Sequence, residues 1–308
     1  MEISEALIDE YLESCKIDRR LSVHTLRAYK CDLLQFLDWS QKAHKNELNR
    51  NNIKTYVSLL KASYSSKTAK RKYASIKALM TYLYDENEHP GNPLLGFRAK
   101  FNTPFTLPRV IPLDELSKIL ETSESENASD FWTIRNHTIV EMLISTGIRV
   151  SELCAININD FDLRFKTLTI KGKGNKERTV QLECQQSFKL LVEYINARIE
   201  LHLKQDAKSA DIPLFVNRFG SRLSDQSVRK IIRKISRDAG IVTTITPHMF
   251  RHTFATTLLE EGVDIRYIQK ILGHSSIRTT EIYTHVSESK QREILRMHNP
   301  RDVIRRRE

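Results

Sequence analysis

The chain beyond residue 140 holds the residue types needed to attack a phosphodiester without a metal ion: Arg149, Lys173, His248, Arg251, His274 and Tyr283. An arginine guanidinium can pair with two phosphate oxygens at once, and it is not lost by deprotonation. Two such guanidiniums can stabilise the extra negative charge of a pentacoordinate phosphorus transition state. The residue types therefore predict a site for phosphoryl transfer.

The other residue types supply a nucleophile and the means to move protons. A phenol with a pKa of about 10 attacks only when a base accepts its proton or nearby cations favour the phenolate. A lysine can protonate the leaving 5′-oxygen as a general acid. Each residue alone is weak evidence, because Tyr283 is one of ten tyrosines and Lys173 shares its segment with Lys171 and Lys176. It is the combination of types that favours this chemistry.

Four segments carry these residues: TGIRVSEL (146–153), IKGKGNKERTV (170–180), HMFRHTFATTLL (248–259) and LGHSSIRTTEIYTH (272–285). In order and spacing they resemble the motifs of the tyrosine recombinases. The stretch LSVHTLRAYKCDLLQFLDW (21–39) resembles the N-terminal core-binding domain of the same family. Together with MHNPR (297–301), these segments make the Xer type the nearest likeness, and the resemblance covers nearly the whole chain.

The resemblance implies how the scissile phosphate would be held. Arg149 and Arg251 would bind it, and His274 would donate a hydrogen bond to it. Glu152 lies one helical turn after Arg149 and would orient the Arg149 guanidinium from behind.

The resemblance also implies the proton transfers and the covalent step. Lys173 would act as the general acid towards the 5′-hydroxyl, although Lys171 and Lys176 on the same hairpin keep that assignment open. His248 would move or hold the proton of Tyr283, and Tyr283 would become a 3′-phosphotyrosine. No cofactor and no metal ion would be required.

The elements that position these residues follow from local patterns. His248 and Arg251 are three residues apart on a helix opened by Thr246-Pro247, so they share one face. Two strands, 168–170 and 178–182, flank a hairpin turn at 172–176. Helices are predicted over 130–146, 185–203, 225–239, 248–261, 264–271 and 288–297.

Prolines divide the chain. Five of the eight prolines fall between Pro90 and Pro112, which predicts an extended linker. Before it, apolar residues recur at helical spacing, and Ser22 and Ser65 or Ser66 can cap two of the helices. We expect four parts, which are a helical core-binding domain, a linker, a catalytic domain and a tail helix exchanged between protomers: residues 1–88, 89–112, 113–287 and 288–308. The predicted fold class is mainly α with a small antiparallel sheet (α+β), and the resemblance adds a C-shaped clamp around DNA.

Positive charge is in excess and is unevenly spread. The net charge is +11, which favours a polyanionic partner such as nucleic acid. Between Lys42 and Lys77 there are ten basic residues and one acidic residue, Glu47. Such a run is usually a solvated face, but its single sign favours contact with DNA phosphates. The predicted contact residues are Lys67, Lys70, Arg71 and Lys77.

Cysteine usage and the start of the chain indicate the compartment. The four cysteines are far apart without a C-x-x-C pair, which favours reduced thiols. No signal peptide and no membrane span is recognisable, so we expect a cytoplasmic protein without a membrane partner. The resemblance implies double-stranded DNA as substrate and a tetramer on DNA, built from this chain alone or with a second recombinase.

Three other functions compete with recombination. A type IB topoisomerase uses the same chemistry, but the core-binding-like domain and the length of chain after Tyr283 disfavour it. A metal enzyme could use His248 and His252 at i, i+4, but no glutamate completes H-E-x-x-H and Arg251 would repel a cation. An inactive DNA-binding protein would not need the full catalytic set. Whether the enzyme resolves chromosome dimers or integrates and excises a mobile element stays open.

Overall fold

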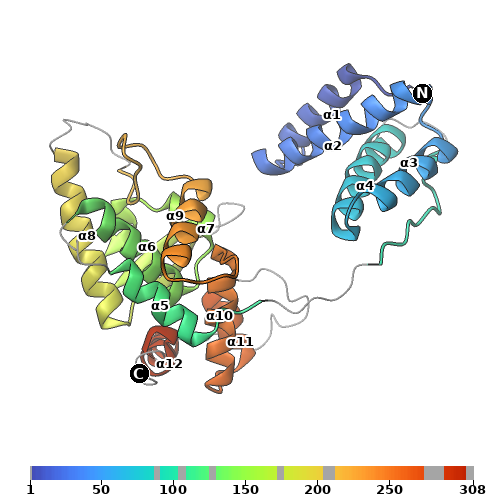
Figure 1. Ribbon diagram of the computed structural model, residues 1–308. Helices are drawn as coiled ribbons and strands as arrows, with labels where there is room; N and C mark the ends of the chain where they lie inside the picture. Colours follow the sequence, from blue (N-terminus) through green and yellow to red (C-terminus); the bar gives the residue numbers. More distant parts are fainter. Residues whose placement is uncertain are drawn as a thin grey trace. The chain divides into compact units, whose positions relative to one another are not determined.

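The computed structural model describes residues 2–86, 91–102, 109–124, 130–171, 177–203, 212–273 and 288–302. The chain forms two compact units, which we call the N-terminal unit, Met1–Thr106, and the C-terminal unit, Leu107–Glu308 (Figure 1). Helices dominate both units, and the C-terminal unit adds a three-stranded antiparallel sheet. The predicted mainly α fold with a small sheet is confirmed.

The helices of the N-terminal unit are α1 (Glu5–Ile17), α2 (Val23–Lys42), α3 (Arg50–Ser63), α4 (Ser66–Thr81) and the π-helical turn η1 (Tyr82–Glu86). Side-chain oxygens begin these helices by accepting from free backbone N–H groups. Ser22 accepts from Thr25 at the start of α2, and Ser65 accepts from Thr68 at the start of α4. Both caps agree with the sequence pattern.

Part of the predicted linker belongs to the folded units. Leu94 is buried in the N-terminal core, and the rings of Phe97 and Phe101 lie 6.0 and 5.7 Å from that of Tyr73. At the other end, Ile111 is buried in the C-terminal core, where its backbone N–H donates to a threonine hydroxyl of α10. Proline content signals that helix stops, but it does not reveal whether apolar residues nearby will pack.

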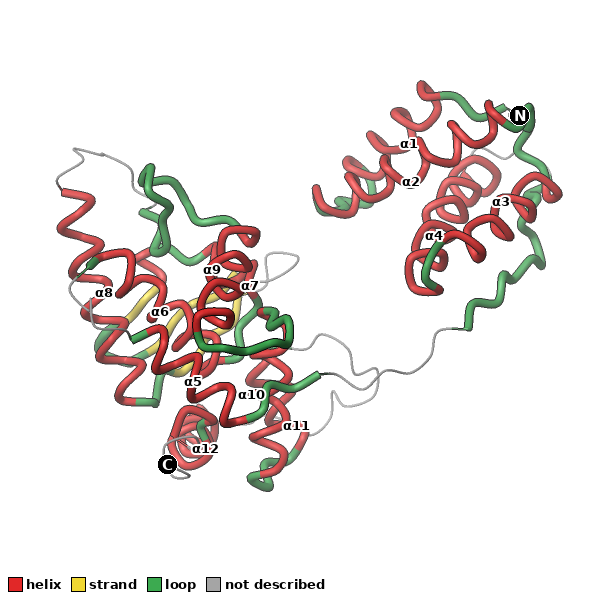
Figure 2. The backbone as a smooth tube through the Cα atoms, viewed as in Figure 1, coloured by secondary structure: helices red, strands yellow, loops and turns green. Residues whose placement is uncertain are grey.

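The C-terminal unit combines a small sheet with many helices (Figure 2). Its elements are α5 (Leu113–Ser123), α6 (Phe131–Thr146), α7 (Val150–Ala155), the 3-10 turn η2 (Ile158–Asp160), β1 (Phe161–Asp162), β2 (Thr167–Lys171), β3 (Glu177–Gln181), α8 (Gln185–Leu203), α9 (Asp225–Asp238), α10 (Pro247–Glu260), α11 (Ile265–Leu272) and α12 (Glu288–His298). The predicted strands pair in the register Ile170 with Arg178, and each predicted helix is present.

Helix α6 is the centre of the C-terminal core. It packs against α5, α8 and α10, and it is buried on nearly every side from Arg135 onward. A helix without a polar face must be enclosed by other elements. None of the described helices is both long and apolar enough to cross a membrane.

Helix α12 packs on its own unit in this structure. Ile294 and Leu295 are buried in a small apolar cluster with side chains of α10 and α11. Beyond the helix, the Asn299 amide donates to the Ser145 carbonyl at 3.0 Å, and Arg301 pairs with Glu141 at 2.9 Å. The apolar stripe of the tail therefore covers part of the core of the chain that carries it.

Candidate active site

The junction between α6 and α7 positions Arg149. Helix α6 ends at Gly147, whose φ of 61° lies in the left-handed region that favours glycine. A Cβ at Gly147 would stand 2.7 Å from the Phe254 ring, so the backbone packs directly on α10. The chain then turns, and Arg149 becomes the N-cap residue of α7.

A capping interaction fixes Arg149 to Glu152. The Glu152 carboxylate accepts the Arg149 backbone N–H and the Arg149 Nη1, each at 2.7 Å. Glu152 is only 6% exposed, whereas 37% of the Arg149 side chain is open to solvent. The guanidinium is thus held at one edge and accessible at the rest, a geometry suited to receiving an anion.

Arg178 on β3 is a site residue that the sequence reasoning missed. Its guanidinium donates to both oxygens of Glu152, at 2.6 Å through Nη1 and 2.9 Å through Nη2. The signal was present, because Arg178 lies two residues before the buried Val180 and therefore on the same face of the strand. A charged residue on the inward face of a strand needs a partner, and Glu152 is that partner.

The three charges set the ionisation of Glu152. Burial by itself raises the pKa of this carboxyl, but hydrogen bonds and charge from Arg178 and Arg149 outweigh the burial and lower the pKa to about 2. Glu152 is therefore an anion at neutral pH.

Arg251 is more deeply buried than Arg149. It is 7% exposed, and its two terminal nitrogens donate to the carbonyls of Gly147 and Leu272 at 2.8 and 2.7 Å. Burial, together with repulsion from Arg149, lowers the pKa of Arg251 to about 10, so the group is still protonated at neutral pH. Arg251 thereby joins the ends of α6 and α11 next to the Arg149 cation.

His248 lies one turn before Arg251 on α10 and is exposed. Partial desolvation of its ring lowers its pKa, and so do the neighbouring Arg229, His252, Arg251 and Arg149. The imidazole is therefore neutral near pH 7 and able to accept a proton.

Three predicted site residues, Lys173, His274 and Tyr283, lie outside the described residues. The structure describes residues that flank Lys173 and precede His274. Lys171 and Glu177, at the two sides of the hairpin, pair in the β2–β3 ladder, and Leu272 accepts a hydrogen bond from Arg251.

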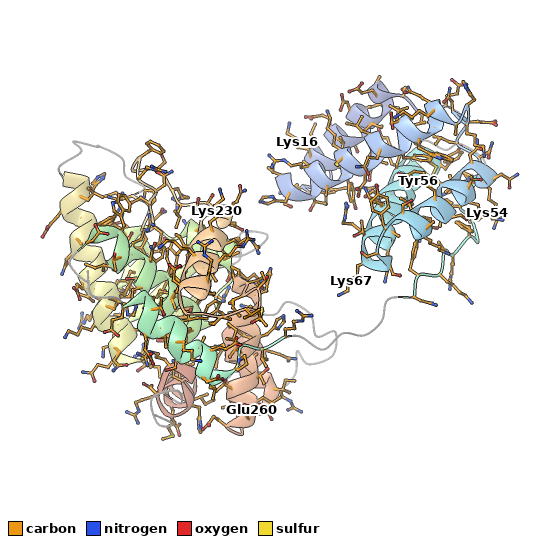
Figure 3. All side chains as sticks on the ribbon, viewed as in Figure 1. Lys16, Lys54, Tyr56, Lys67, Lys230 and Glu260 are labelled. Atoms are coloured by element: carbon orange, nitrogen blue, oxygen red, sulfur yellow. The ribbon has the colours of Figure 1, made fainter. Side chains whose placement is uncertain are left out.

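The predicted DNA-contact residues share an exposed face of α4: Lys67, Lys70, Arg71 and Lys77. Lys67 projects from the first turn of α4 in Figure 3. Arg71 also pairs with the buried Asp32 of α2. Lys72, from the same basic run, is only 4% exposed and pairs with Asp32 at 3.1 Å, so that lysine is structural.

A second basic face was not predicted. It lies on α9, where Val228, Ile232 and Ile235 face the core and the cations lie on the other side. We call it the α9 basic face, and its members are Arg229, Lys230, Arg233, Lys234 and Arg237. Lys230 projects from α9 in Figure 3. The helical period of Val228, Ile232 and Ile235 was the signal for this face in the sequence. The charge of Arg229, at one edge of the face, helps to lower the pKa of His248.

Comparison with known proteins identifies the family. Residues 109–290 match the phage integrase family, and residues 8–87 match its N-terminal SAM-like domain. The chain is 41% identical over 300 residues to a tyrosine recombinase of Agathobacter rectalis, with 96% of each chain covered. It is 37% identical over 281 residues to the tyrosine recombinase XerC of Thermodesulfovibrio yellowstonii, with 91% of each covered.

A solved structure extends the likeness to three dimensions. The XerH site-specific recombinase, bound to its difH substrate in a pre-cleavage complex, is 27% identical and has a TM-score of 0.66. The match covers 87% of this chain and 79% of that one. The chain therefore belongs to the phage integrase family and is a Xer-like tyrosine recombinase, an enzyme that cleaves and rejoins DNA at specific sites.

Proposed function

We propose that Tyr283 is the nucleophile of this recombinase and that Arg149 and Arg251 hold the scissile phosphate. The observation that carries the proposal is the pair of guanidiniums fixed side by side, one by Glu152 and the other by two backbone carbonyls. Guanidiniums held before the substrate arrives need no reorganisation when charge develops on the phosphorus.

In the proposed step, the Tyr283 oxygen bonds to phosphorus and the bond from phosphorus to the 5′-oxygen breaks. The phenol proton moves towards His248, whose neutral imidazole can accept it. Lys173 protonates the departing 5′-oxygen, and His274 donates a hydrogen bond to the phosphate. The 5′-hydroxyl of a partner strand then reverses the attack, so the bond energy is conserved and no cofactor is consumed.

The proposed substrate is double-stranded DNA carrying a recombination site. Two exposed basic surfaces support this, the α4 face with Lys67, Lys70, Arg71 and Lys77 and the α9 basic face. Contacts from such faces go mainly to phosphate and position the protein on the duplex. We further propose that the enzyme acts as a tetramer on DNA, either of identical chains or with a second recombinase.

The proposed place of action is the cytoplasm. All four cysteines are free in the structure, which suits a reducing compartment. The cellular task is chromosome-dimer resolution or integration and excision of a mobile element, and both use the same strand exchange.

The test is covalent trapping of the protein on a nicked DNA duplex. The duplex carries the binding sequence that is found by footprinting the protein on the DNA of its host. A nick beside the scissile phosphate lets the short product diffuse away, so the protein–DNA adduct accumulates. Tyr283→Phe is expected to bind this duplex normally and to form no adduct, because only the attacking oxygen is removed. Tyr267→Phe on α11 is the matched control and should form the adduct.

Two results would contradict the proposal. A denaturation-resistant adduct with Tyr283→Phe would show that another residue is the nucleophile. Complete loss of the wild-type adduct in chelator would show that a metal ion takes part.

A further inference from the structure

Arg178 stands where three parts of the active site meet. It belongs to β3, which begins directly after the hairpin that carries Lys173. Its guanidinium reaches Glu152 on α7, and its aliphatic stem packs on Gly273, the residue before His274. Neither the sequence motifs nor the proposed chemistry assigns Arg178 a task.

The Glu152 carboxylate is shared equally by two arginines. Oε1 accepts from Nη1 of Arg149 at 2.7 Å and from Nη1 of Arg178 at 2.6 Å. Oε2 accepts from the Arg149 backbone N–H at 2.7 Å and from Nη2 of Arg178 at 2.9 Å. The Arg149 bonds are local to one turn of chain, so among the residues that the structure describes, Arg178 is the one whose hydrogen bonds tie the carboxylate to a different element.

Arg178 is not placed to bind DNA itself. Both terminal nitrogens of its fork are engaged by Glu152, and its side chain is only 18% exposed. Bidentate pairing fixes the plane of the carboxylate as well as its position. What Arg178 can transmit is therefore the orientation of Glu152, and through it the orientation of Arg149.

The contact with Gly273 adds a second constraint. A Cβ at Gly273 would lie 2.7 Å from Cδ and 3.0 Å from Nε of Arg178, so the backbone at the end of α11 rests on the Arg178 stem. The preceding residue, Leu272, accepts a hydrogen bond from Arg251. Arg178 thus touches Glu152, which holds Arg149, and Gly273, which follows the residue whose carbonyl holds Arg251.

We propose that Arg178 is a positioning residue for DNA cleavage, which holds Glu152 so that Glu152 presents Arg149 to the scissile phosphate. This inference rests on the proposed role of Arg149. It predicts that the arginine fork matters, and not only the positive charge, because an ammonium cannot span both carboxylate oxygens in one plane.

The test is a double-mutant cycle in the full-length protein on the same nicked duplex. Arg178→Met keeps the stem and removes the fork, and it should slow single-turnover adduct formation about 10- to 100-fold, the usual cost of losing a support behind a reacting group. DNA affinity should be nearly unchanged. In a Glu152→Gln background, the further effect of Arg178→Met should be small, since the two residues act as one unit.

Two more comparisons separate positioning from other roles. Arg164→Met removes an equivalent charge from the exposed β1–β2 turn and should leave cleavage as in the wild type. Replacing the leaving 5′-oxygen by sulfur makes a general acid dispensable, because a thiolate leaves without a proton. The Arg178→Met defect should persist on that substrate if it acts through Arg149.

The inference would be overturned if Arg178→Met slowed cleavage equally in the wild-type and Glu152→Gln backgrounds. It would also be overturned if the sulfur substrate fully restored cleavage by Arg178→Met, because Arg178 would then act through the general acid Lys173. If Arg178→Met does not fold, Arg178→Lys tests the inference instead. Cleavage by Arg178→Lys at the wild-type rate would show that the arginine fork is not required. Absence of a tyrosine adduct in the wild type would instead refute the proposed nucleophile.

Discussion

At the scale of single residues, the site places one buried carboxylate among three arginines. Glu152 is hydrogen-bonded to Arg149 and Arg178, and its charge also acts on Arg251. A lone buried guanidinium is costly, and Glu152 offsets that cost for its neighbours. One anion cannot balance three cations, so net positive charge remains around Glu152, as the proposed binding of a phosphate by Arg149 and Arg251 requires.

A prediction at this scale concerns His248 and its neighbour Arg229. The positive charge of Arg229 contributes to lowering the pKa of His248. Removing that charge in Arg229→Gln should raise the pKa of His248. As the pH falls, His248 would then become protonated at a higher pH than in the wild type, and a protonated imidazole cannot accept the phenol proton. The acidic limb of the cleavage-rate profile should shift to higher pH, measured by adduct formation at saturating DNA.

The neighbouring exposed cation provides the control. Lys230→Gln removes a charge from the same α9 basic face, where Lys230 projects away from the helix (Figure 3), and should leave the limb in place. An unshifted limb in Arg229→Gln, or an equal shift in both variants, would show that the acidic limb does not report on His248.

At the scale of elements, the end of α6 is where Arg251 and the tail are attached to the core. The last carbonyls of a helix have no partner within it and must be satisfied from outside. Here Gly147 O accepts from Arg251, and Ser145 O accepts from Asn299 of the tail. A buried helix end thus becomes the anchor for Arg251, one of the two proposed phosphate-binding residues, and for the C-terminal segment.

Gly147→Ala tests this anchor. Alanine at a φ of 61° is strained, and its Cβ would meet Phe254 at 2.7 Å. The positive φ should cost about 1–2 kcal/mol of unfolding free energy, and the overpacking about 1–3 kcal/mol more. Cleavage should also fall, because the carbonyl that holds Arg251 must move. Gly240→Ala, with a φ of 73° and nothing within 4 Å of its Cβ, should show the first cost alone in chemical denaturation.

Similar unfolding free energies for the two alanine variants would mean that the backbone at Gly147 has room to move. Normal cleavage by a destabilised Gly147→Ala would show that this junction contributes to stability but does not control the position of Arg251.

At the scale of the whole molecule, the tail packs on the core of its own unit, and we predict that it also takes part in assembly. In the structure, Arg301 pairs with the buried Glu141, while Ile294 and Leu295 fill an apolar cluster of the same chain. An exchanged tail would make the same contacts on a neighbouring protomer, and head-to-tail docking of this kind closes into rings. In this structure the tail is docked on its own unit, and we predict that on DNA the tail is exchanged between neighbouring protomers.

Removal of the chain after Ser287 is expected to leave a DNA-binding protein that is less stable and that fails to assemble and recombine. Arg301→Ala is the sharper test. Leaving Glu141 buried without this cation should cost about 3 kcal/mol of unfolding free energy and should weaken assembly on DNA. Arg296→Ala, on the exposed side of α12, should do neither. Sedimentation with and without the duplex, and a recombination assay, measure both effects.

Full assembly and recombination by the truncated chain would rule out exchange of the tail. Normal assembly by a destabilised Arg301→Ala would restrict this contact to folding within one chain.

The sequence by itself determined the features that depend on neighbouring residues. Helix starts at Ser22 and Ser65 follow from local hydrogen bonds, and the strands about the hairpin follow from alternation over a few residues. The motif residues could be named because each motif is a short continuous segment. The roles of Lys173, His274 and Tyr283 are predictions from such motifs.

Only the tertiary structure decided which distant groups meet. Lys72 and Lys70 look alike in the sequence, yet Lys72 is buried against Asp32, 40 residues away. Arg251 is held by Gly147, 104 residues earlier, and Arg178 finds Glu152 across 26 residues. A buried charge takes whatever partner the packing of helices and strands brings within hydrogen-bonding distance, and no local pattern of residues encodes that approach.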